Sequence, residues 1–392
     1  MSEGHSVRIR RGFVVTAALL ASALMVTGCA RDTSAGGEAP AAGGGGATAC
    51  ATGTPPSGGA AAAAPTSAPA TKPDASALKV GVAYDIGGRG DQSFNDAAFA
   101  GVEKAVADFG LLQSNVKELT AAPNEPEDAA ATRLRQLAAD GYNPIIAVGF
   151  KYAGALGTVA AELPNTKFAI VDDSSIKLPN VTSLVFAEEQ GSFLVGVAAA
   201  LKSKACHIGF VGGVDVPLIQ KFEAGYIQGA KAVAPNIKIE SKYITPAGDF
   251  TGFQDPQKGS VVATGELDAG ADVIYHAAGA SGAGVFSAVK AKSTPDAPKY
   301  AIGVDSDQYK TADPAVRDVI ITSMLKRVDV AVHDYIGAVA TGDLTGLPKI
   351  FDLKVNGVGY STTGGKIDDI VAKLEAYKNA IISGAITVKT TT

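Results

Sequence analysis

Short apolar runs alternate with stretches of helical periodicity from residue 79 almost to the end of the chain. The apolar runs are rich in Val and Ile, as is typical of buried strands. We expect strands at 80–83, 116–120, 145–148, 167–171, 181–186, 208–212, 237–244, 273–275, 300–303 and 319–324. We expect helices near 95–110, 127–140, 152–163, 188–203, 216–233, 256–268, 282–291, 327–341 and 368–383. Regular alternation of strands and helices predicts a doubly wound parallel α/β fold. Because a single sheet of ten strands would be unusually wide, we expect the strands to be divided between two lobes.

The first strand-loop-helix unit, residues 79–109, is the most informative stretch of the chain. Its apolar run ends at Asp85, a glycine-rich loop follows, and apolar residues recur at helical spacing from Asn95 onward. In an open parallel sheet, ligands bind at the loops that follow the carboxyl ends of the strands. This places Asp85, Asp91, Ser93, Phe94 and Asn95 in a candidate site. The unit that begins at residue 207 repeats the same arrangement.

The chemistry of this loop narrows the class of ligand. Neither glycine-rich phosphate motif is present, and the carboxylates of Asp85 and Asp91 would repel a phosphate. Carboxylate and amide groups beside an aromatic ring suit a neutral ring that carries hydroxyl or amine groups. A structural interpretation remains open, in which Phe94 is a core residue and Asp91 and Ser93 cap the helix.

Further polar or glycine positions follow later strands: Asp172, Asp173, Gly279, Asp305, Asp307 and Lys326. Any one of them could be an ordinary helix cap, but together they are more than solvated loops require. Phe250 and Phe253 lie in a glycine-bearing loop and could supply a second aromatic partner. A flat ring between Phe94 and Phe253 would gain contact on both faces, which leaves carboxylates and Lys326 for the hydroxyls of an attached sugar.

The N-terminus has the features of an export signal. Three arginines precede an apolar run at 12–26 that is short for a membrane span, and small residues follow. The sequence Val26-Thr-Gly-Cys29 resembles the lipobox of bacterial lipoproteins, which implies a signal peptide at 1–28 and a lipidated Cys29. An uncleaved anchor or an ordinary signal is the alternative. Residues 29–76 are rich in Gly, Ala and Pro, which predicts a disordered tether.

The three cysteines have no spacing typical of a zinc site or a disulfide framework. Cys50 falls in the predicted tether and Cys206 at the start of a predicted strand. We therefore expect Cys206 to be a buried, unreactive thiol.

Charge and length limit the possible partners. The chain has 392 residues and a net charge of −5, to which the signal region contributes +2, so the mature chain is near −7. This argues against nucleic acid as a partner. Beyond the tether we expect a binding domain at 77–392. Its first lobe would span about 77–200 with a C-terminal part from about 305, and its second lobe about 205–304.

A set of motifs across this domain resembles one known family. The motifs are Asp85-x-Gly-Gly-x-x-Asp91-x-Ser-Phe-Asn95, Phe168-Ala-Ile-Val-Asp172, Phe222-Glu-Ala-Gly-Tyr226-x-x-Gly229, Phe253-x-Asp-Pro256, Ala278-Gly279-x-x-Gly282-x-Gly284 and Ile302-Gly-Val-Asp-Ser-Asp-Gln308. Together they resemble the basic membrane protein (BMP) family of substrate-binding lipoproteins, whose characterised members include purine nucleoside receptors of ABC transporters. The resemblance implies a type I periplasmic-binding-protein fold, in which two α/β lobes enclose a ligand cleft.

The resemblance also assigns roles to residues by position. It implies that Phe94 and Phe253 stack on a nucleoside base, with Phe250 and Phe222 as alternatives to Phe253. Asp85, Asp91 and Asn95 would address the edge of the base. The residues expected around the ribose are Asp172, Gly279, Asp305 and Lys326.

The implied function is that of a lipid-anchored receptor on the outer face of the cell membrane. It would close over its ligand and present it to an ABC permease and its ATPase, without a cofactor. A sugar or another small polar metabolite is an alternative ligand, and a sensor without a transport role is an alternative function. An enzyme is disfavoured because the sequence has neither an Asp-rich metal cluster nor a Ser-His pair.

Overall fold

The computed structural model describes residue 50 and the ranges 53–56, 72–122 and 125–392. The expected signal peptide, Cys29 and most of the expected tether lie outside the described residues. Every strand and helix expected from the sequence is present. The structure adds a short antiparallel strand near residue 359 and a one-turn helix after residue 307. The α/β fold class is therefore confirmed.

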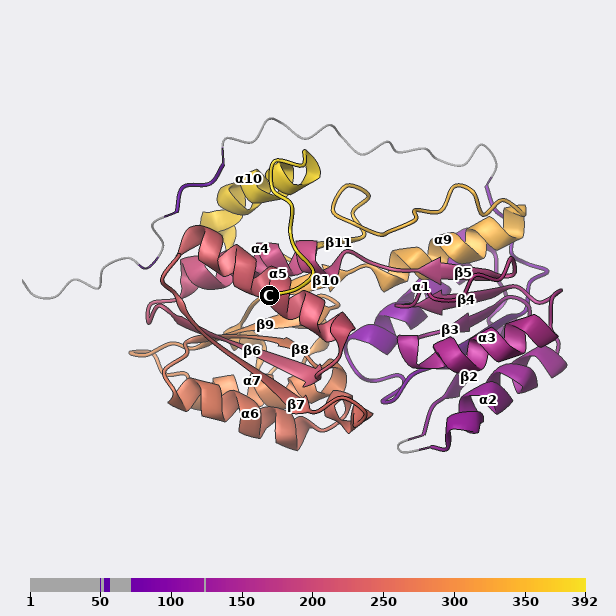
Figure 1. Cartoon of the computed structure of the whole chain (residues 1–392), viewed down its shortest axis with the longest axis horizontal. Coiled ribbons are helices and arrows are strands. Elements are labelled where there is room, and N and C mark those ends of the chain that lie inside the picture. The colour runs from indigo at the N-terminus through magenta and orange to yellow at the C-terminus, as the bar shows by residue number, and fades with distance from the viewer. Residues whose placement is uncertain (1–49, 51–52, 57–71, 123–124) are drawn as a thin grey trace, which may run out of the picture. The chain divides into compact units, whose positions relative to one another are not determined.

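The first lobe contains a five-stranded parallel sheet in the order β2-β1-β3-β4-β5 (Figure 1). Its strands are β1 (Val80–Tyr84), β2 (Val116–Thr120), β3 (Ile145–Ala147), β4 (Phe168–Val171) and β5 (Val181–Leu184). Its helices are α1 (Phe94–Phe109), α2 (Glu127–Ala139) and α3 (Ala153–Glu162), with the 3₁₀ turns η1 (Gln113–Asn115) and η2 (Phe150–Tyr152). Helices α2 and α3 cover one face of the sheet, and α1 covers the other together with α9 (Val328–Thr341) (Figure 1).

The second lobe contains a six-stranded sheet in the order β11-β10-β9-β8-β6-β7. Its strands are β6 (His207–Val214), β7 (Lys238–Thr245), β8 (Val273–Ala277), β9 (Tyr300–Asp305), β10 (Ile320–Lys326) and the antiparallel β11 (Val358–Tyr360). Its helices are α4 (Glu188–Lys202), α5 (Pro217–Val233), α6 (Pro256–Asp268), α7 (Gly282–Lys292), α8 (Gln308–Thr311) and α10 (Val371–Ile382). Its 3₁₀ turns are η3 (Phe250–Phe253), η4 (Gly279–Ser281), η5 (Arg317–Val319) and η6 (Asp368–Ile370).

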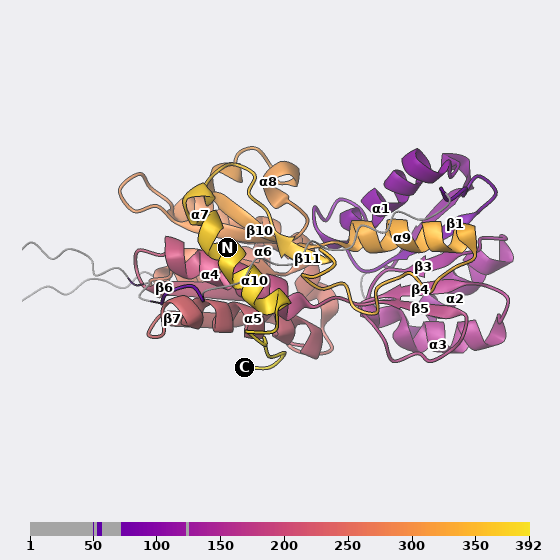
Figure 2. The ribbon, with the colours of Figure 1, turned by 90° about the horizontal axis from the view of Figure 1, so that it is seen from above.

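The division into lobes differs from the one we expected. Strands β10 and β11 continue the second sheet, and α4 packs against α5 rather than against the first lobe. Of the chain after residue 305, α9 packs on the first lobe, beside α1 (Figure 2). Gln308 and Thr311 of α8 also donate hydrogen bonds to Gln92 O of the first lobe. The expected boundaries near 200 and 305 were wrong because alternation counts strands and helices but does not say which sheet each strand joins.

Three segments connect the lobes. They are 185–188 before α4, 326–328 between β10 and α9, and the return from α9 to β11. Main-chain hydrogen bonds join these segments: Phe351 N donates to Val185 O over 2.8 Å, and Arg327 N donates to Gly357 O over 2.9 Å. The three connecting segments, which we call the crossings, therefore lie side by side, as a hinge between the lobes requires.

Helices α4 and α5 approach each other unusually closely. A Cβ added to Gly229 would lie 1.9 Å from Phe193 O, and one added to Gly225 would lie 2.1 Å from Glu189 O. Only glycine fits at these two points. The Gly-Tyr226-x-x-Gly motif of the sequence thus packs the second lobe rather than binding a ligand.

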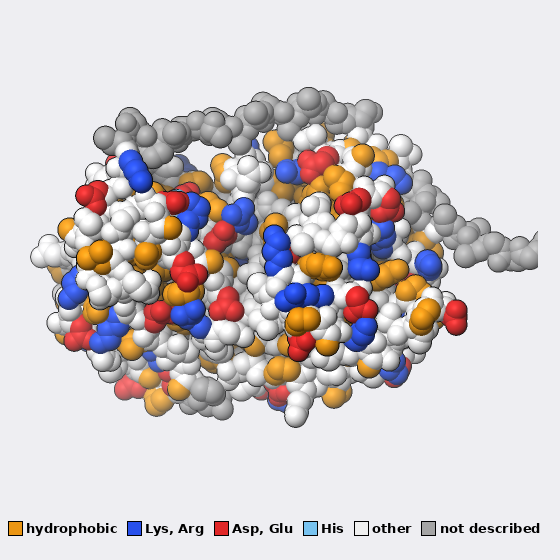
Figure 3. Space-filling model, turned by 180° about the vertical axis from the view of Figure 1, so that it is seen from behind, with side chains coloured by type: hydrophobic (Ala, Val, Ile, Leu, Met, Phe, Trp, Pro, Cys, Tyr) orange, Lys and Arg blue, Asp and Glu red, His pale blue; other side chains and the backbone are white. Residues whose placement is uncertain are grey.

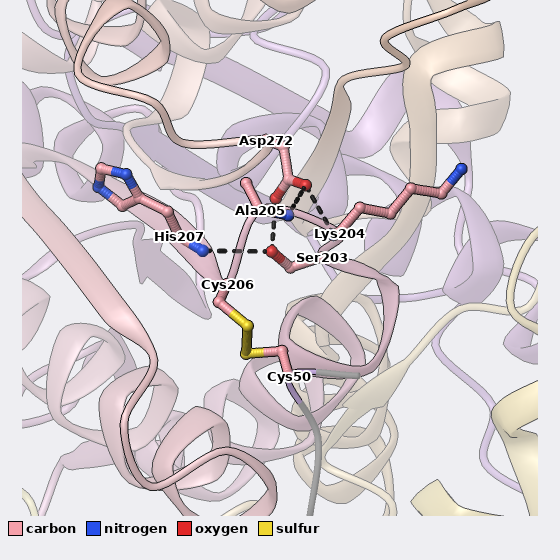
Figure 4. The surroundings of a disulfide bond; sticks show 7 residues. All are labelled: Cys50, Ser203, Lys204, Ala205, Cys206, His207 and Asp272. Carbon is pink, nitrogen blue, oxygen red and sulfur yellow. Dashed lines mark hydrogen bonds between the residues drawn. A yellow bond between two sulfur atoms is a disulfide. The ribbon is translucent and has the colours of Figure 1, made fainter. Parts of the chain in front are cut away.

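A disulfide joins Cys50 to Cys206 (Figure 4). The expectation that Cys206 is a free thiol was therefore wrong. The partners are 156 residues apart in the chain, and no local spacing pattern could have paired them. The bond attaches a residue of the expected tether to the second lobe.

Acidic and basic side chains are interspersed over the face shown in Figure 3. Among the residues that the structure describes, no helix has both the length and the apolar character needed to cross a bilayer.

Candidate binding cleft

The nine residues to which the resemblance assigns binding roles line one cavity, whereas the other strand-end candidates, Ser93, Asp173 and Asp307, are not among its lining residues. The nine residues are Asp85, Asp91, Phe94, Asn95, Asp172, Phe253, Gly279, Asp305 and Lys326. The cavity encloses about 600 Å³ of space, part of it open to solvent, and residues of both lobes form its walls. The carboxyl ends of β1, β4, β8, β9 and β10 meet there, as the placement of these residues after strands predicted.

The loop wall, which we define as Asp85, Asp91 and Asn95, forms the first-lobe side. Asp91 organises it: Oδ1 accepts hydrogen bonds from the N–H groups of Ser93 (3.0 Å) and Asp96 (3.1 Å), and Oδ2 accepts from Asn95 N (2.8 Å). The capping interpretation of Asp91 therefore describes its contacts in this structure. Burial raises the pKa of Asp91 to about 6 although these N–H groups favour the carboxylate.

Asn95 presents a free acceptor to the cavity. Its Nδ2 donates to Asp91 Oδ2 over 3.1 Å, which fixes the orientation of the amide. The buried Oδ1 has no hydrogen-bond partner among the described residues. An unpaired buried acceptor costs free energy unless a ligand or water donates to it.

Asp85 lies at the end of β1, where its Oδ1 accepts a hydrogen bond from Ile86 N over 2.7 Å. Its other oxygen lies against Gly149, where an added Cβ would be 2.6 Å from Asp85 Oδ2. Gly149 also has a φ of 113°, so glycine is required there both for space and for conformation. Burial raises the pKa of Asp85 to about 6.

Three aromatic side chains of the expected set and its alternatives line the cavity: Phe94, Phe253 and Phe222. Phe253 lies against β6, where an added Cβ on Gly213 would be 2.4 Å from its ring. Phe250 instead lines a neighbouring cavity, with its ring centroid 6.0 Å from that of Phe150. The structure thus separates the two aromatics of this loop: Phe253 lines the cleft, and Phe250 lines the neighbouring cavity.

The hinge cluster, defined as Asp172, Glu188, Asp305 and Lys326, lies at the crossings between the lobes. Lys326 Nζ donates to Asp172 Oδ2 over 2.6 Å, and both side chains are almost fully buried. Nζ also lies 5.0 Å from the ring centroid of Phe94 and 5.6 Å from that of Phe222. Burial by itself lowers the pKa of Lys326, but the three carboxylates raise it above its ordinary value. Lys326 is therefore a fixed positive charge beside the aromatic rings.

Glu188 is a member of the hinge cluster that no sequence pattern indicated. Its Oε1 lies 3.6 Å from Lys326 Nζ, its Oε2 lies 3.6 Å from Lys221 Nζ, and the side chain is 1% exposed. Burial raises its pKa to about 7, although Lys326 opposes that shift. An acidic residue in the first turn of a helix is common, so the sequence carried no signal for this role.

Asp305 connects the two walls. Its carboxylate accepts a hydrogen bond from Ser93 Oγ over 2.6 Å, and the donor belongs to the opposite lobe. Ser306 Oγ also donates to Ser93 O over 2.9 Å. Burial raises the pKa of Asp305 although Lys326 and Ser93 lower it. Ser93 thus joins the lobes rather than capping α1.

Asp172 and Asp305 share a backbone conformation. Their φ angles are 70° and 62°, in the left-handed region that Asp tolerates better than most residues. Each comes at or just after the end of a parallel strand, so each turn directs a carboxylate into the cleft. Asp172 Oδ1 has no hydrogen-bond partner among the described residues and is a second free acceptor.

The combination of groups suits binding. The cleft has buried carboxylate and amide acceptors, one buried ammonium group and aromatic rings, contributed by both lobes. Such a set can stack on the face of a flat ring and accept hydrogen bonds from hydroxyl or N–H groups.

Three comparisons place this geometry among known proteins. A family model described as "ABC transporter substrate-binding protein PnrA-like" matches residues 77–392. The ABC transporter nucleoside-binding protein BmpA of Lactococcus lactis is 35% identical over 79% of this chain and 89% of its own length. An uncharacterized lipoprotein of Pyrococcus abyssi is 37% identical over 74% of this chain and 70% of its own length.

A solved structure shares the architecture. A solute-binding protein of an Aeropyrum pernix ABC transporter superposes with a TM-score of 0.67 at 30% identity, covering 80% of this chain and 93% of that chain. The two-lobe type I periplasmic-binding fold is confirmed by this match. These are solute-binding proteins rather than enzymes. The chain belongs to the Bmp family of PnrA-like substrate-binding proteins of ABC transporters.

Proposed function

We propose that this protein binds a nucleoside, with purine nucleosides preferred, in the cleft between its lobes and delivers it to an ABC permease and its ATPase. The observation that carries the proposal is that both lobes contribute aromatic and charged groups to one cavity. The name of the Lactococcus lactis relative supports the same ligand class. In this proposal Cys29 carries the lipid that holds the protein at the outer face of the cell membrane, and the Pyrococcus abyssi relative is likewise named a lipoprotein.

The proposed roles follow the two walls. The base lies between Phe94 and Phe253, where stacking on both faces stabilises a flat ring. Asn95 Oδ1 accepts a hydrogen bond from an N–H group at the edge of the base, close to Asp85 and Asp91. The ribose lies toward Gly279 and the hinge cluster, where Asp172 Oδ1 accepts from one hydroxyl group and Asp305 from another.

Ligand binding and lobe closure are linked in this proposal. A ligand that contacts both lobes binds the closed arrangement more tightly than an open one, so it shifts the population toward closure. The Ser93–Asp305 and Ser306–Ser93 hydrogen bonds are contacts of the closed arrangement. A permease that recognises both lobes together would then distinguish loaded from empty receptor.

Calorimetry on residues 30–392 tests the ligand class. The protein is unfolded without reductant and refolded, so that bound ligand is removed and the disulfide is kept. It is then titrated with adenosine, guanosine, inosine, uridine, ribose and adenine. We expect tight binding of purine nucleosides and at least 100-fold weaker binding of ribose and adenine. Tight binding of ribose without adenosine would establish the sugar alternative, and silence from every compound would reject the proposed ligand class.

Two variants of one loop provide a matched control. Phe253→Ala removes a ring that lines the cleft, whereas Phe250→Ala removes a ring three residues away that lines the neighbouring cavity. We expect the first change to weaken adenosine binding by about 10-fold or more, which is the usual range for loss of a stacking ring. The second should leave the affinity within about threefold. Equal effects would contradict the assignment of Phe253 as the stacking residue.

A further inference from the structure

Two described residues of the expected tether, Cys50 and Gly53, are attached to the second lobe. Cys50 is bonded to Cys206 directly before β6 (Figure 4). Three residues later, Gly53 N donates a hydrogen bond to Val233 O at the end of α5 over 2.7 Å. A Cβ on Gly53 would lie 2.4 Å from Ala232 O, so the segment is pressed against that helix end. Residues 50 and 53 are thus attached to the second lobe at two independent points.

The turn that presents Cys206 is held rigidly. Asp272 accepts hydrogen bonds from Ser203 Oγ (2.6 Å), Lys204 N (2.7 Å) and Ala205 N (2.7 Å), and its side chain is buried (Figure 4). Cys206 itself has a φ of 53° and its carbonyl accepts from Lys238 N over 2.9 Å. A cysteine held in this way has little freedom, so its thiol is positioned for one partner.

The described chain reaches the first lobe at Pro73 and Ala75. Ala75 is fully buried, and its N–H donates to Phe109 O over 2.8 Å. An added Cβ on Gly337 of α9 would lie 3.4 Å from Pro73 Cγ. Along the described chain, Cys50 and Gly53 therefore contact the second lobe before Pro73 and Ala75 contact the first lobe. This order is the reverse of the order in which the two lobes follow in the sequence.

We propose that the Cys50–Cys206 disulfide makes the second lobe the point at which the membrane anchor holds the protein. The inference rests on the proposed lipid at Cys29. Cys50 lies 21 positions after Cys29, whereas Lys72, where the described chain begins its approach to the first lobe, lies 43 positions after Cys29. For a flexible chain these lengths correspond to a typical reach of about 25 Å and about 36 Å. The bond shortens the tether, and it leaves the first lobe free to move relative to the anchored second lobe.

The bond forms by ordinary thiol–disulfide exchange outside the cytoplasm. The thiols of Cys50 and Cys206 together lose two electrons and two protons to a disulfide-bearing oxidant, which leaves as a dithiol. An exported protein meets such oxidants, whereas a cytoplasmic one does not.

A protease site inserted between Pro65 and Thr66 tests the proposal in the full-length, exported chain. After cleavage in isolated membranes, the disulfide is the only covalent connection between the anchor and the domain. We expect the domain to stay in the membrane pellet after cleavage and to enter the supernatant when a reductant is added. In a Cys50→Ser variant with the same insertion, cleavage alone should release the domain. The uncut chain with native cysteines controls for release by the reductant itself.

Release of the native-cysteine domain by cleavage alone would overturn the proposal. A separate readout distinguishes failure of the anchor: if the uncut protein is already soluble, the lipid at Cys29 is absent. The cleaved sample is then run on a non-reducing gel. There the N-terminal fragment must still migrate with the domain, and separation from it without reductant would show that the disulfide is absent. Cys206→Ser should behave as Cys50→Ser does, and its thermal unfolding shows whether it remains folded.

Discussion

The loop wall and the hinge cluster both present buried carboxylates to the same cleft, but different contacts hold them in place. In the loop wall, Asp91 bonds to residues within five positions of itself. In the hinge cluster, Lys326 bonds to Asp172 from 154 residues away, and Ser93 bonds to Asp305 from 212 residues away. The first wall is a local motif that one loop builds, whereas the second exists only when the lobes and their crossings come together.

The difference has an energetic consequence. Carboxylates that accept several main-chain N–H bonds are stabilised by groups that stay in place as the lobes move. Carboxylates that depend on one buried ammonium group lose their partner if it is removed, and an uncompensated buried charge is costly. Changes in the hinge cluster should therefore affect both folding and binding, and changes in the loop wall should act on one lobe.

The largest effect is expected from Lys326→Met. The change leaves Asp172 buried without its cation and leaves Glu188 with Lys221 alone, so we expect the free energy of unfolding to fall by about 3 kcal/mol or more. Nucleoside binding should fall at least 100-fold. Urea unfolding and calorimetry measure the two losses. Lys151→Met, which removes a lysine of the neighbouring cavity, is the control. It should change the free energy of unfolding and the nucleoside affinity by much less. A stable, fully binding Lys326→Met protein would contradict the importance of the cluster.

Asp91→Ala should have the next largest effect on stability. It removes the acceptor of three main-chain N–H groups at the start of α1, which we expect to cost about 2 kcal/mol in urea unfolding. Asp91→Asn retains one acceptor oxygen, so its free energy of unfolding should lie between those of Asp91→Ala and the native protein. If both variants unfold like the native protein, the local wall does not depend on this carboxylate.

Asp305→Ala should weaken nucleoside binding by about 10- to 100-fold, because it removes a buried acceptor that faces the cleft. Ser93→Ala removes the same interlobe hydrogen bond but keeps the carboxylate, and it serves as the matched control. We expect Ser93→Ala to cost less than fivefold in affinity. Equal losses in the two variants would assign Asp305 to lobe closure alone and reject its contact with the ribose.

The smallest effect is a pH dependence that comes from Glu188. Burial raises the pKa of this group from an ordinary 4.5 to about 7 in the folded protein, so the folded state holds the proton more tightly. Its stabilising contribution is complete below about pH 4.5 and is lost as the pH rises through 7. The stability of the native protein relative to Glu188→Gln should therefore fall by about 1–2 kcal/mol between pH 4.5 and 7. Parallel stability curves for the two proteins would contradict this account.

Much of the molecule was predictable because the information is local. In the described part of the chain, periodicity identified every strand and α-helix except β11 and α8. Placement after strand ends selected mostly residues that line one cavity, although Ser93, Asp173 and Asp307 do not line it. Local signals also left two interpretations of Asp91 open, as ligand group or cap. The structure shows the capping contacts, and the carboxylate still faces the cleft.

The α/β elements, the strand-end positions of the cleft residues and the family motifs could be read from the chain, because each depends on residues that are close together in it. Three features could be seen only in the folded molecule: β10 and β11 join the second sheet, Glu188 lies beside Lys326, and Cys50 pairs with Cys206. Each of these is a contact between distant segments. Sheet membership, ion pairing and disulfide pairing depend on how whole elements pack, and no spacing along one chain encodes that.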